Sequence, residues 1–145
     1  MTELSDRYYV LTYGTLMRGR ANYSWMQAAQ GEFVDTVISS TEDYTMFSVH
    51  ESFPAIMLNG KSRFMGELFA VPAEGILYSL DYLEGYPTFY DRKIISCKGI
   101  QSGTEYKALC YIFTPQSAAT MGQNLLTYQQ SPKIAYKNNC YKWLD

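Results

Sequence analysis

The sequence predicts an α+β fold in which a compact, curved or barrel-like mixed sheet carries two or three peripheral helices. Segments rich in aromatic and β-branched residues recur along the chain at the length of short strands, and turn residues separate them. Only two or three stretches have helical spacing or composition. The 145 residues suffice for one hydrophobic core, and no shift of composition divides them. We therefore predict a single domain, 1–145.

The first half of the chain begins with a strand and a short helix. The predicted strand from Tyr8 to Tyr13 runs directly into Gly14, and the stretch from Asn22 to Ala29 predicts a short helix closed by Gly31. A meander of short strands follows, separated by turn residues. These strands are Phe33 to Ser39, Tyr44 to Val49, Ala55 to Leu58 and Phe64 to Val71.

A second helix interrupts the strands between Ile76 and Leu83. Its apolar residues at helical spacing are Ile76, Leu77, Leu80 and Leu83. Gly85 suits the left-handed residue after a helix end, and Pro87 prevents continuation.

The segments from Tyr90 to Cys97 and from Tyr106 to Phe113 predict a hairpin around the glycines at 99 and 103. The stretch from Ser117 to Gln129 fits either a helix or a loop with one turn, because Gly122 weakens the helical pattern.

Composition and charge exclude several classes of protein. A hydrophobic content of 47% against 18% charged residues argues against disorder, and no apolar run has the length of a membrane-spanning helix. The segment from Met1 to Arg7 lacks the pattern of a secretory signal, so we expect a cytoplasmic protein. The net charge of −2, without a basic run, argues against a nucleic-acid partner.

The sequence predicts no metal site, because its only histidine, His50, has no partner at metal-ligand spacing. The cysteines are odd in number and widely spaced, so we expect them to be reduced and mostly buried. They are Cys97, Cys110 and Cys140.

Lysines and aromatic residues gather near the C-terminus and allow two interpretations. They can form a binding surface, or they can belong to a terminal segment that docks on the domain. The residues are Lys133, Tyr136, Lys137, Tyr141, Lys142 and Trp143.

Glu84 is the candidate for acid/base chemistry, because it places a carboxylate at the end of the second helix. The unpaired carbonyls of a helix end disfavour a negative charge. Burial beside Tyr82, Tyr86 and Phe89 would add to this effect and raise the pKa of Glu84 toward the range useful for proton transfer. An ordinary helix end with a solvated glutamate has the same sequence pattern.

The segment from Tyr13 to Leu16 is the candidate for anion binding. Gly14 allows the chain to turn after the first strand, so that successive backbone N–H groups point into one concavity. The glycine repeats and lysine of a nucleotide loop are missing, which favours a carboxylate over a polyphosphate. A simple turn glycine is the alternative.

In combination, the motifs resemble the gamma-glutamyl cyclotransferase-like family. They are Tyr-Gly-Thr-Leu at 13–16, Phe-Pro-Ala-Ile at 53–56, Gly-Glu-Leu-Phe at 66–69, and Leu-Asp-x-x-Glu-Gly-Tyr-Pro at 80–87 with Tyr90-x-Arg92. The resemblance spans roughly residues 8–114, and the order of the motifs is more specific than any one of them. It implies a compact mixed α/β barrel whose first loop forms an oxygen-binding cavity.

The resemblance also implies roles for individual residues. Glu84 matches the catalytic glutamate, and the substrate-binding loop falls on Tyr13, Gly14, Thr15 and Leu16. Asp81 matches the motif as a structural residue, and Tyr90 matches it as a cavity wall. The stretch Met-Arg-Gly-Arg at 17–20 departs from the commoner pattern, so its two arginines either tune the accepted leaving group or are solvated.

The implied reaction cyclises a γ-glutamyl group to 5-oxoproline and releases an amine or amino acid, without a cofactor. Such an enzyme is a lyase or transferase of small γ-glutamyl molecules. Two other interpretations stay open at this point. One is a noncatalytic protein that holds a small anionic metabolite in the same cavity, and the other is a purely structural module.

Overall fold

The computed structural model describes residues 7–145. The expectation about the segment from Met1 to Arg7 therefore lies, except for Arg7, outside the described residues. The strands are β1 (Arg7–Thr12), β2 (Glu32–Ser39), β3 (Tyr44–Val49), β4 (Phe53–Leu58), β5 (Arg63–Pro72), β6 (Tyr90–Gly99), β7 (Glu105–Phe113), β8 (Leu125–Leu126), β9 (Ile134–Lys137) and β10 (Cys140–Trp143). The helices are α1 (Tyr23–Ala28), α2 (Ala73–Gly75), α3 (Asp81–Glu84) and α4 (Pro115–Met121), with a π-helical turn η2 (Ile76–Leu80) and a 3-10 turn η3 (Gly122–Asn124). None of these helices is long and apolar enough to cross a membrane.

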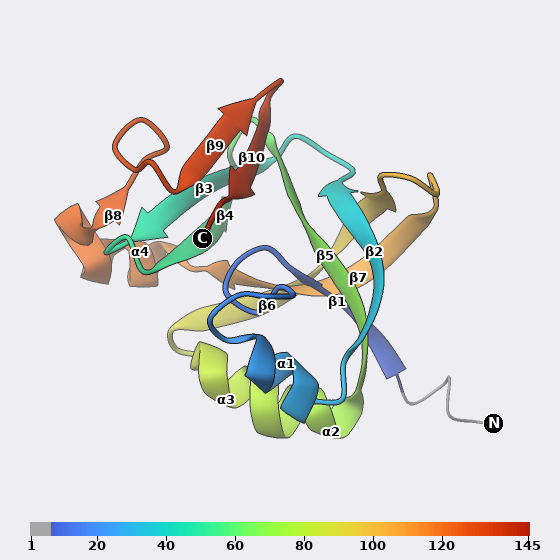
Figure 1. Ribbon diagram of the computed structural model, residues 1–145. Coiled ribbons are helices and arrows are strands. Elements are labelled where there is room, and N and C mark those ends of the chain that lie inside the picture. Colours follow the sequence, from blue (N-terminus) through green and yellow to red (C-terminus); the bar gives the residue numbers. More distant parts are fainter. Residues whose placement is uncertain (1–6) are drawn as a thin grey trace.

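Five strands close into a barrel. β1 pairs antiparallel with β5 and parallel with β7, β7 pairs with β6, and β2 joins β6 to β5. The interior is filled by alternate side chains of these strands, among them the fully buried Leu11, Val37, Phe64 and Leu68. The predicted α+β barrel is therefore confirmed, and Figure 1 shows α1, α2 and α3 together on one side of it.

A second sheet of three strands, in the order β4-β3-β8, lies at the other end of the molecule from α1 and α2 (Figure 1). β4 begins at Phe53, two residues earlier than predicted, because Pro54 is accommodated in an edge strand. The stretch from Ser117 that fitted either a helix or a loop contains both. The helix α4 ends at Met121, before Gly122 with φ +55°, and the turn η3 follows.

The C-terminal hairpin of β9 and β10 is an addition that the sequence did not predict. β10 pairs parallel with β5, with Cys140 opposite Arg63 and Tyr141 opposite Phe64. Trp143 is fully buried and Tyr141 nearly so. This segment is therefore docked on the domain, as one of the two interpretations held.

The helical segment before Glu84 is longer than predicted, and of its four predicted apolar residues all but Leu77 face the core. α2, η2 and α3 follow one another without a break from residue 73 to residue 84. Ile76 and Leu80, four residues apart, are buried, whereas Leu77 is 52% exposed. Leu77 is one residue on from Ile76, about 100° around the helix, so its assignment to the apolar face was wrong.

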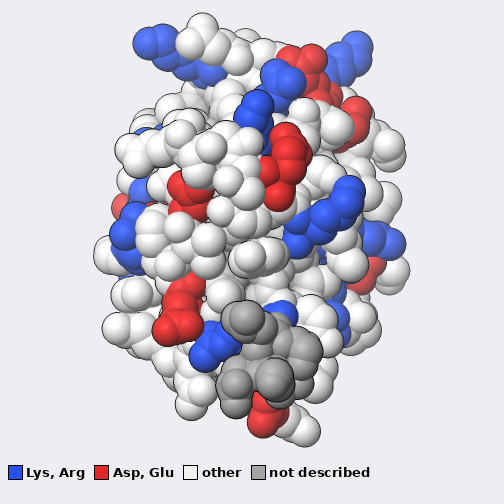
Figure 2. Space-filling model, turned by 90° about the vertical axis from the view of Figure 1, so that its right-hand side faces the viewer, with Lys and Arg blue, Asp and Glu red and all other residues white. Residues whose placement is uncertain are grey.

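On the face drawn in Figure 2, basic and acidic side chains are interspersed. The three cysteines are free, with Cys97 and Cys110 buried and Cys140 half-buried, as predicted.

Candidate active site

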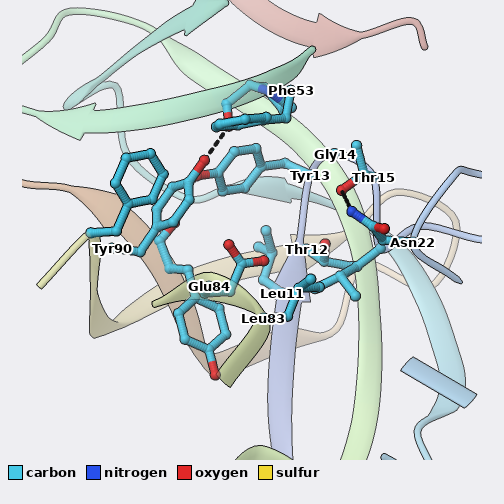
Figure 3. Close-up of a pocket in the computed structure, with 14 residues that line it drawn as sticks. Leu11, Thr12, Tyr13, Gly14, Thr15, Asn22, Phe53, Leu83, Glu84 and Tyr90 are labelled. Atoms are coloured by element: carbon cyan, nitrogen blue, oxygen red, sulfur yellow. Dashed lines mark hydrogen bonds between the residues drawn. The ribbon is translucent and has the colours of Figure 1, made fainter. Parts of the chain in front are cut away.

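A cavity of about 260 Å³ lies between the loop after β1, the start of β4, the end of α3 and the strands β6 and β7 (Figure 3). This volume is close to the lower end of the range for small-molecule sites. The lining residues are Leu11, Thr12, Tyr13, Gly14, Thr15, Leu16, Asn22, Phe53, Pro54, Leu83, Glu84, Phe89, Tyr90 and Tyr111. The structure thus brings all of the predicted site residues to one cavity.

The loop after β1 forms one wall, and its backbone defines that wall. A Cβ atom on Gly14 would lie 2.5 Å from Cγ of Pro54, so only glycine fits here without a shift of the neighbouring chain. Within residues 7–145, the backbone N–H groups of Gly14, Thr15 and Leu16 donate no hydrogen bond. Asn22 fixes the loop through its N–H to the carbonyl of Thr15 at 2.8 Å and its Nδ2 to Oγ1 of Thr15 at 3.0 Å. The wall therefore presents backbone donors on a fixed loop.

Glu84 forms the opposite wall at the end of α3, where Gly85 is left-handed with φ +65° as predicted. Figure 3 shows the carboxylate of Glu84 pointing into the cavity, between Leu83 and the rings of Tyr13 and Tyr90. Among the described residues, this carboxylate has no hydrogen-bond partner. Burial raises the pKa of Glu84 to about 7.

The predicted cause of this raised pKa needs one correction. Tyr82 does not bury Glu84, because its ring is 77% exposed and stacks on Trp25 of α1 at 6.0 Å. Tyr82 precedes Glu84 by two residues in the helix, so the two side chains point in different directions. Phe89, by contrast, does line the cavity beside Glu84.

Three tyrosines line the cavity, and each phenol has a fixed acceptor. Tyr13 donates to the carbonyl of Tyr111 at 2.7 Å, and Tyr90 donates to the carbonyl of Pro54 at 2.8 Å. Tyr111 donates to Oδ1 of Asp81 at 2.6 Å. Burial raises the pKa of the Tyr13 and Tyr90 phenols well above the ordinary value, so both are neutral at pH 7. Of the described side chains that line the cavity, Glu84 is the only one whose pKa lies near neutral pH.

Asp81 does not line the cavity, and its contacts fit the structural role that the motif implied. Its side chain is buried, and Oδ1 also accepts from Nε of Arg92 at 3.1 Å. The Arg92 guanidinium lies over the ring of Tyr86, 4.1 Å from its centroid. These contacts fix the end of α3 to β6 and β7.

Neither arginine of the 17–20 stretch lines the cavity. Arg18 binds Glu67 through its backbone N–H, 2.8 Å from Oε1, and through its guanidinium, and it lies over the ring of Phe33. Arg20 donates to the carbonyl of Trp143 in β10. Arg18 is exposed, as one of the two expectations held, and the fold supplies both arginines with acceptors that the local sequence does not reveal. A role in selecting the leaving group stays a prediction.

Asn22 and Tyr111 are site residues that the sequence reasoning missed. Asn22 was interpreted only as the start of a helix, and Tyr111 only as a strand residue. The hairpin register places Tyr111 opposite Arg92, and this pairing with a motif residue is a signal that could have found it. In the described part of the chain, no cluster of three or more potential metal ligands occurs.

Comparison with known proteins identifies similar sequences and folds. A family model described as "Gamma-glutamyl cyclotransferase, AIG2-like" matches residues 10–133. A Drosophila melanogaster protein named "Putative gamma-glutamylcyclotransferase" is 27% identical over 132 residues, covering 88% of this chain and 83% of the relative. A Methanocaldococcus jannaschii protein with the same description is 32% identical over 114 residues, covering 78% of this chain and 89% of the relative. The crystal structure of an AIG2-like protein from Mus musculus is similar in fold, with a TM-score of 0.66, 24% identity, and coverage of 76% of this chain and 81% of that chain.

Proposed function

The chain belongs to the gamma-glutamyl cyclotransferase, AIG2-like family, and on this premise we propose that it converts the γ-glutamyl group of a small molecule to 5-oxoproline and releases an amine or amino acid. One observation carries the proposal. Glu84 presents a carboxylate with a pKa of about 7 to a cavity that is also lined by Gly14, Thr15 and Leu16, whose backbone N–H groups donate no hydrogen bond within residues 7–145. A single group that is half ionised near pH 7 can both accept and return a proton.

The reaction begins at the α-ammonium of the substrate, which must lose a proton before it can attack. The Glu84 carboxylate takes this proton, and the free amine attacks the γ-carbonyl carbon to form the five-membered ring. The protonated Glu84 then donates to the leaving nitrogen as its C–N bond breaks. The ring nitrogen gives up a second proton and the released amine takes up one from solution, so the protons balance and no oxidant or cofactor is needed.

The loop wall supplies the binding of the γ-glutamyl head. The N–H groups of Gly14, Thr15 and Leu16 are available to the substrate α-carboxylate, and they would be strong partners for an anion, because hydrogen bonds to a charged acceptor are stronger than those between neutral groups. No arginine or lysine lines the cavity among the described residues, so this backbone recognition takes the place of an ion pair.

Ring closure gains from the confinement of the substrate. A carboxylate held at residues 14–16 and an amine placed near Glu84 bring the attacking nitrogen close to the γ-carbonyl, as proximity catalysis requires. The rings of Tyr13, Phe53 and Tyr90 surround this space, and the two phenols hold neighbouring segments in place rather than the substrate. The cavity walls thus position the substrate while Glu84 moves protons.

The test is detection of 5-oxoproline by mass spectrometry after purified protein is incubated with a panel of γ-glutamyl amino acids, γ-glutamyl peptides and γ-glutamyl amines. Glu84→Gln protein, which keeps the shape of the side chain, is the matched control. We expect product from the parent protein and none above background from the variant. Equal product from both proteins would refute Glu84 as the acid/base.

The panel also separates catalysis from simple binding. If the parent protein yields no product from any compound, calorimetric titration of the same compounds shows whether the cavity still holds one of them. Binding without turnover would favour a noncatalytic binding protein over the enzyme.

A further inference from the structure

We propose that Asp81 is a positioning residue for the reaction, because it holds the Tyr111 phenol and thereby keeps the Glu84 carboxylate free of a donor from the protein. Its role in catalysis rests on the proposed function. The arrangement of the three side chains does not, and it can be tested without turnover.

The contacts of Asp81 join the elements on either side of the cavity. Oδ1 accepts from the phenol of Tyr111 in β7 and from Nε of Arg92 in β6, and the Asp81 side chain is buried. The carbonyl of the same Tyr111 accepts the phenol of Tyr13, which belongs to the opposite wall. Tyr111 therefore binds the loop wall through its backbone and the helix wall through its side chain.

Asp81 and Glu84 are three residues apart in α3, so their side chains lie on one face with Cβ atoms about 5–6 Å apart. Tyr111 also lines the cavity into which Glu84 points. The carboxylate that holds the phenol is thus a neighbour, on one helix face, of a second carboxylate that has no hydrogen-bond partner in the described chain. We expect the phenol to turn to Glu84 when Asp81 is removed, because Tyr111 and Glu84 line the same cavity.

The other ionisable groups around Glu84 are less able than the Tyr111 phenol to donate a new hydrogen bond to its carboxylate when Asp81 is replaced. The phenols of Tyr13, after β1, and Tyr90, in β6, donate to backbone carbonyls that remain when Asp81 is replaced. Cys110 of β7 is buried, and its thiol lies 3.9 Å from the carbonyl of Tyr111. Arg92 remains stacked on Tyr86. Tyr111 is thus the phenol around Glu84 whose acceptor is a side chain that can be substituted.

A phenol that donated to Glu84 would change its chemistry. A hydrogen bond to the ionised carboxylate stabilises the charged form and lowers the pKa. Glu84 would then be a weaker base toward the substrate ammonium and would be protonated less often for its return step. By occupying the phenol, Asp81 leaves burial as the dominant influence on Glu84.

The experiment compares Asp81→Ala with Asp81→Ala/Tyr111→Phe. Both variants lose the same charge, so a difference between them comes from the phenol alone. The readout is the pKa of Glu84, measured by carbon-13 NMR of the labelled carboxylates, with Glu84→Gln protein to assign the signal. We expect a fall of about one pH unit in the single variant and recovery of most of it in the double variant. The acid limb of the pH profile of kcat/KM should move in parallel.

Equal pKa values of Glu84 in the single and double variants would overturn the proposal, and so would an unchanged pKa in the single variant. If Asp81→Ala does not fold, Asp81→Leu and Asp81→Leu/Tyr111→Phe make the same comparison with the volume of the side chain retained. A parent protein that forms no 5-oxoproline would refute the proposed function, whereas the NMR comparison would still decide the role of Asp81.

Discussion

The two walls of the cavity are built in opposite ways. The loop wall at residues 14–16 offers backbone N–H groups, and its geometry depends on the missing side chain of Gly14 against Pro54. The helix wall offers one side chain, Glu84, whose pKa depends on burial. The first wall suits recognition of an anion and the second suits proton transfer.

This difference predicts different consequences of substitution. A change on the loop wall acts through steric fit, because the functional atoms belong to the backbone and only a substitution by proline removes an N–H group. A change on the helix wall acts through chemistry, because the functional atoms belong to the side chain. A lost function of the loop wall should therefore be restored by a second change that removes the steric clash, and a lost function of the helix wall only by a side chain that carries a carboxylate.

The largest effect is expected at Glu84. Glu84→Gln should lower kcat by about 10²–10⁴-fold, because the amide cannot accept or return the proton. Glu84→Asp keeps a carboxylate one methylene farther from the substrate, so its rate should lie between those of the parent and the Gln variant. The rate of 5-oxoproline formation under saturating substrate measures both. A Gln variant as fast as the parent would show that the carboxylate is not the reacting group.

The loop wall is tested by Gly14→Ala. The added methyl would meet Cγ and Cδ of Pro54 at 2.5 and 2.7 Å, so the loop must shift and its donors with it. We expect substrate affinity to fall by about tenfold or more and stability by about 1–3 kcal/mol. The second change Pro54→Ala removes the two clashing carbons, and Gly14→Ala/Pro54→Ala should recover much of the affinity, measured by calorimetry. If the double variant does not recover affinity, the effect of Gly14→Ala does not arise from the contact with Pro54.

The burial of Glu84 predicts a dependence of stability on pH. The pKa of Glu84 is raised from the ordinary 4.5 to about 7 in the folded protein, so between these values the unfolded state loses a proton that the folded state keeps. The contribution of Glu84 to stability is therefore present below about pH 4.5, is lost as the pH rises to about 7, and is level above that.

Glu84→Gln has no such loss, so it should be more stable than the parent above pH 7 by up to about 3 kcal/mol, at about 1.36 kcal/mol per pH unit. The gain should vanish near pH 4. Urea unfolding of both proteins at pH 4.5 and pH 8 measures it. An equal difference at the two pH values would mean that Glu84 is not held in a buried environment.

The smallest effect is expected outside both walls. Arg18→Ala removes the ion pair with Glu67 and the contact with the ring of Phe33, which should cost about 1 kcal/mol of stability. Because Arg18 does not line the cavity, kcat/KM should stay within about twofold of the parent value. A larger loss of kcat/KM that is confined to substrates with one class of leaving group would show that Arg18 contributes to substrate selection.

Local sequence patterns predicted much of this architecture. Strand composition located β1 to β7, since the aromatic and β-branched residues and the turn residues that mark strands are local signals. Gly85 marked the helix end, and its left-handed φ bears this out. The patterns failed at Leu77, where one residue of helical phase decides between core and solvent, and at the C-terminal hairpin, whose strands are only four residues long.

By itself, the sequence determined which side chain offers a carboxylate at a helix end and which loop after a strand offers backbone donors, because both follow from neighbours along the chain. Only the tertiary structure decided that the two face each other across one cavity, since this requires β1 to pair with both β5 and β7. It also decided that Asp81 holds Tyr111, thirty residues away in the chain. Burial and hydrogen bonding depend on residues that are distant in sequence, and these two factors give Glu84 its surroundings.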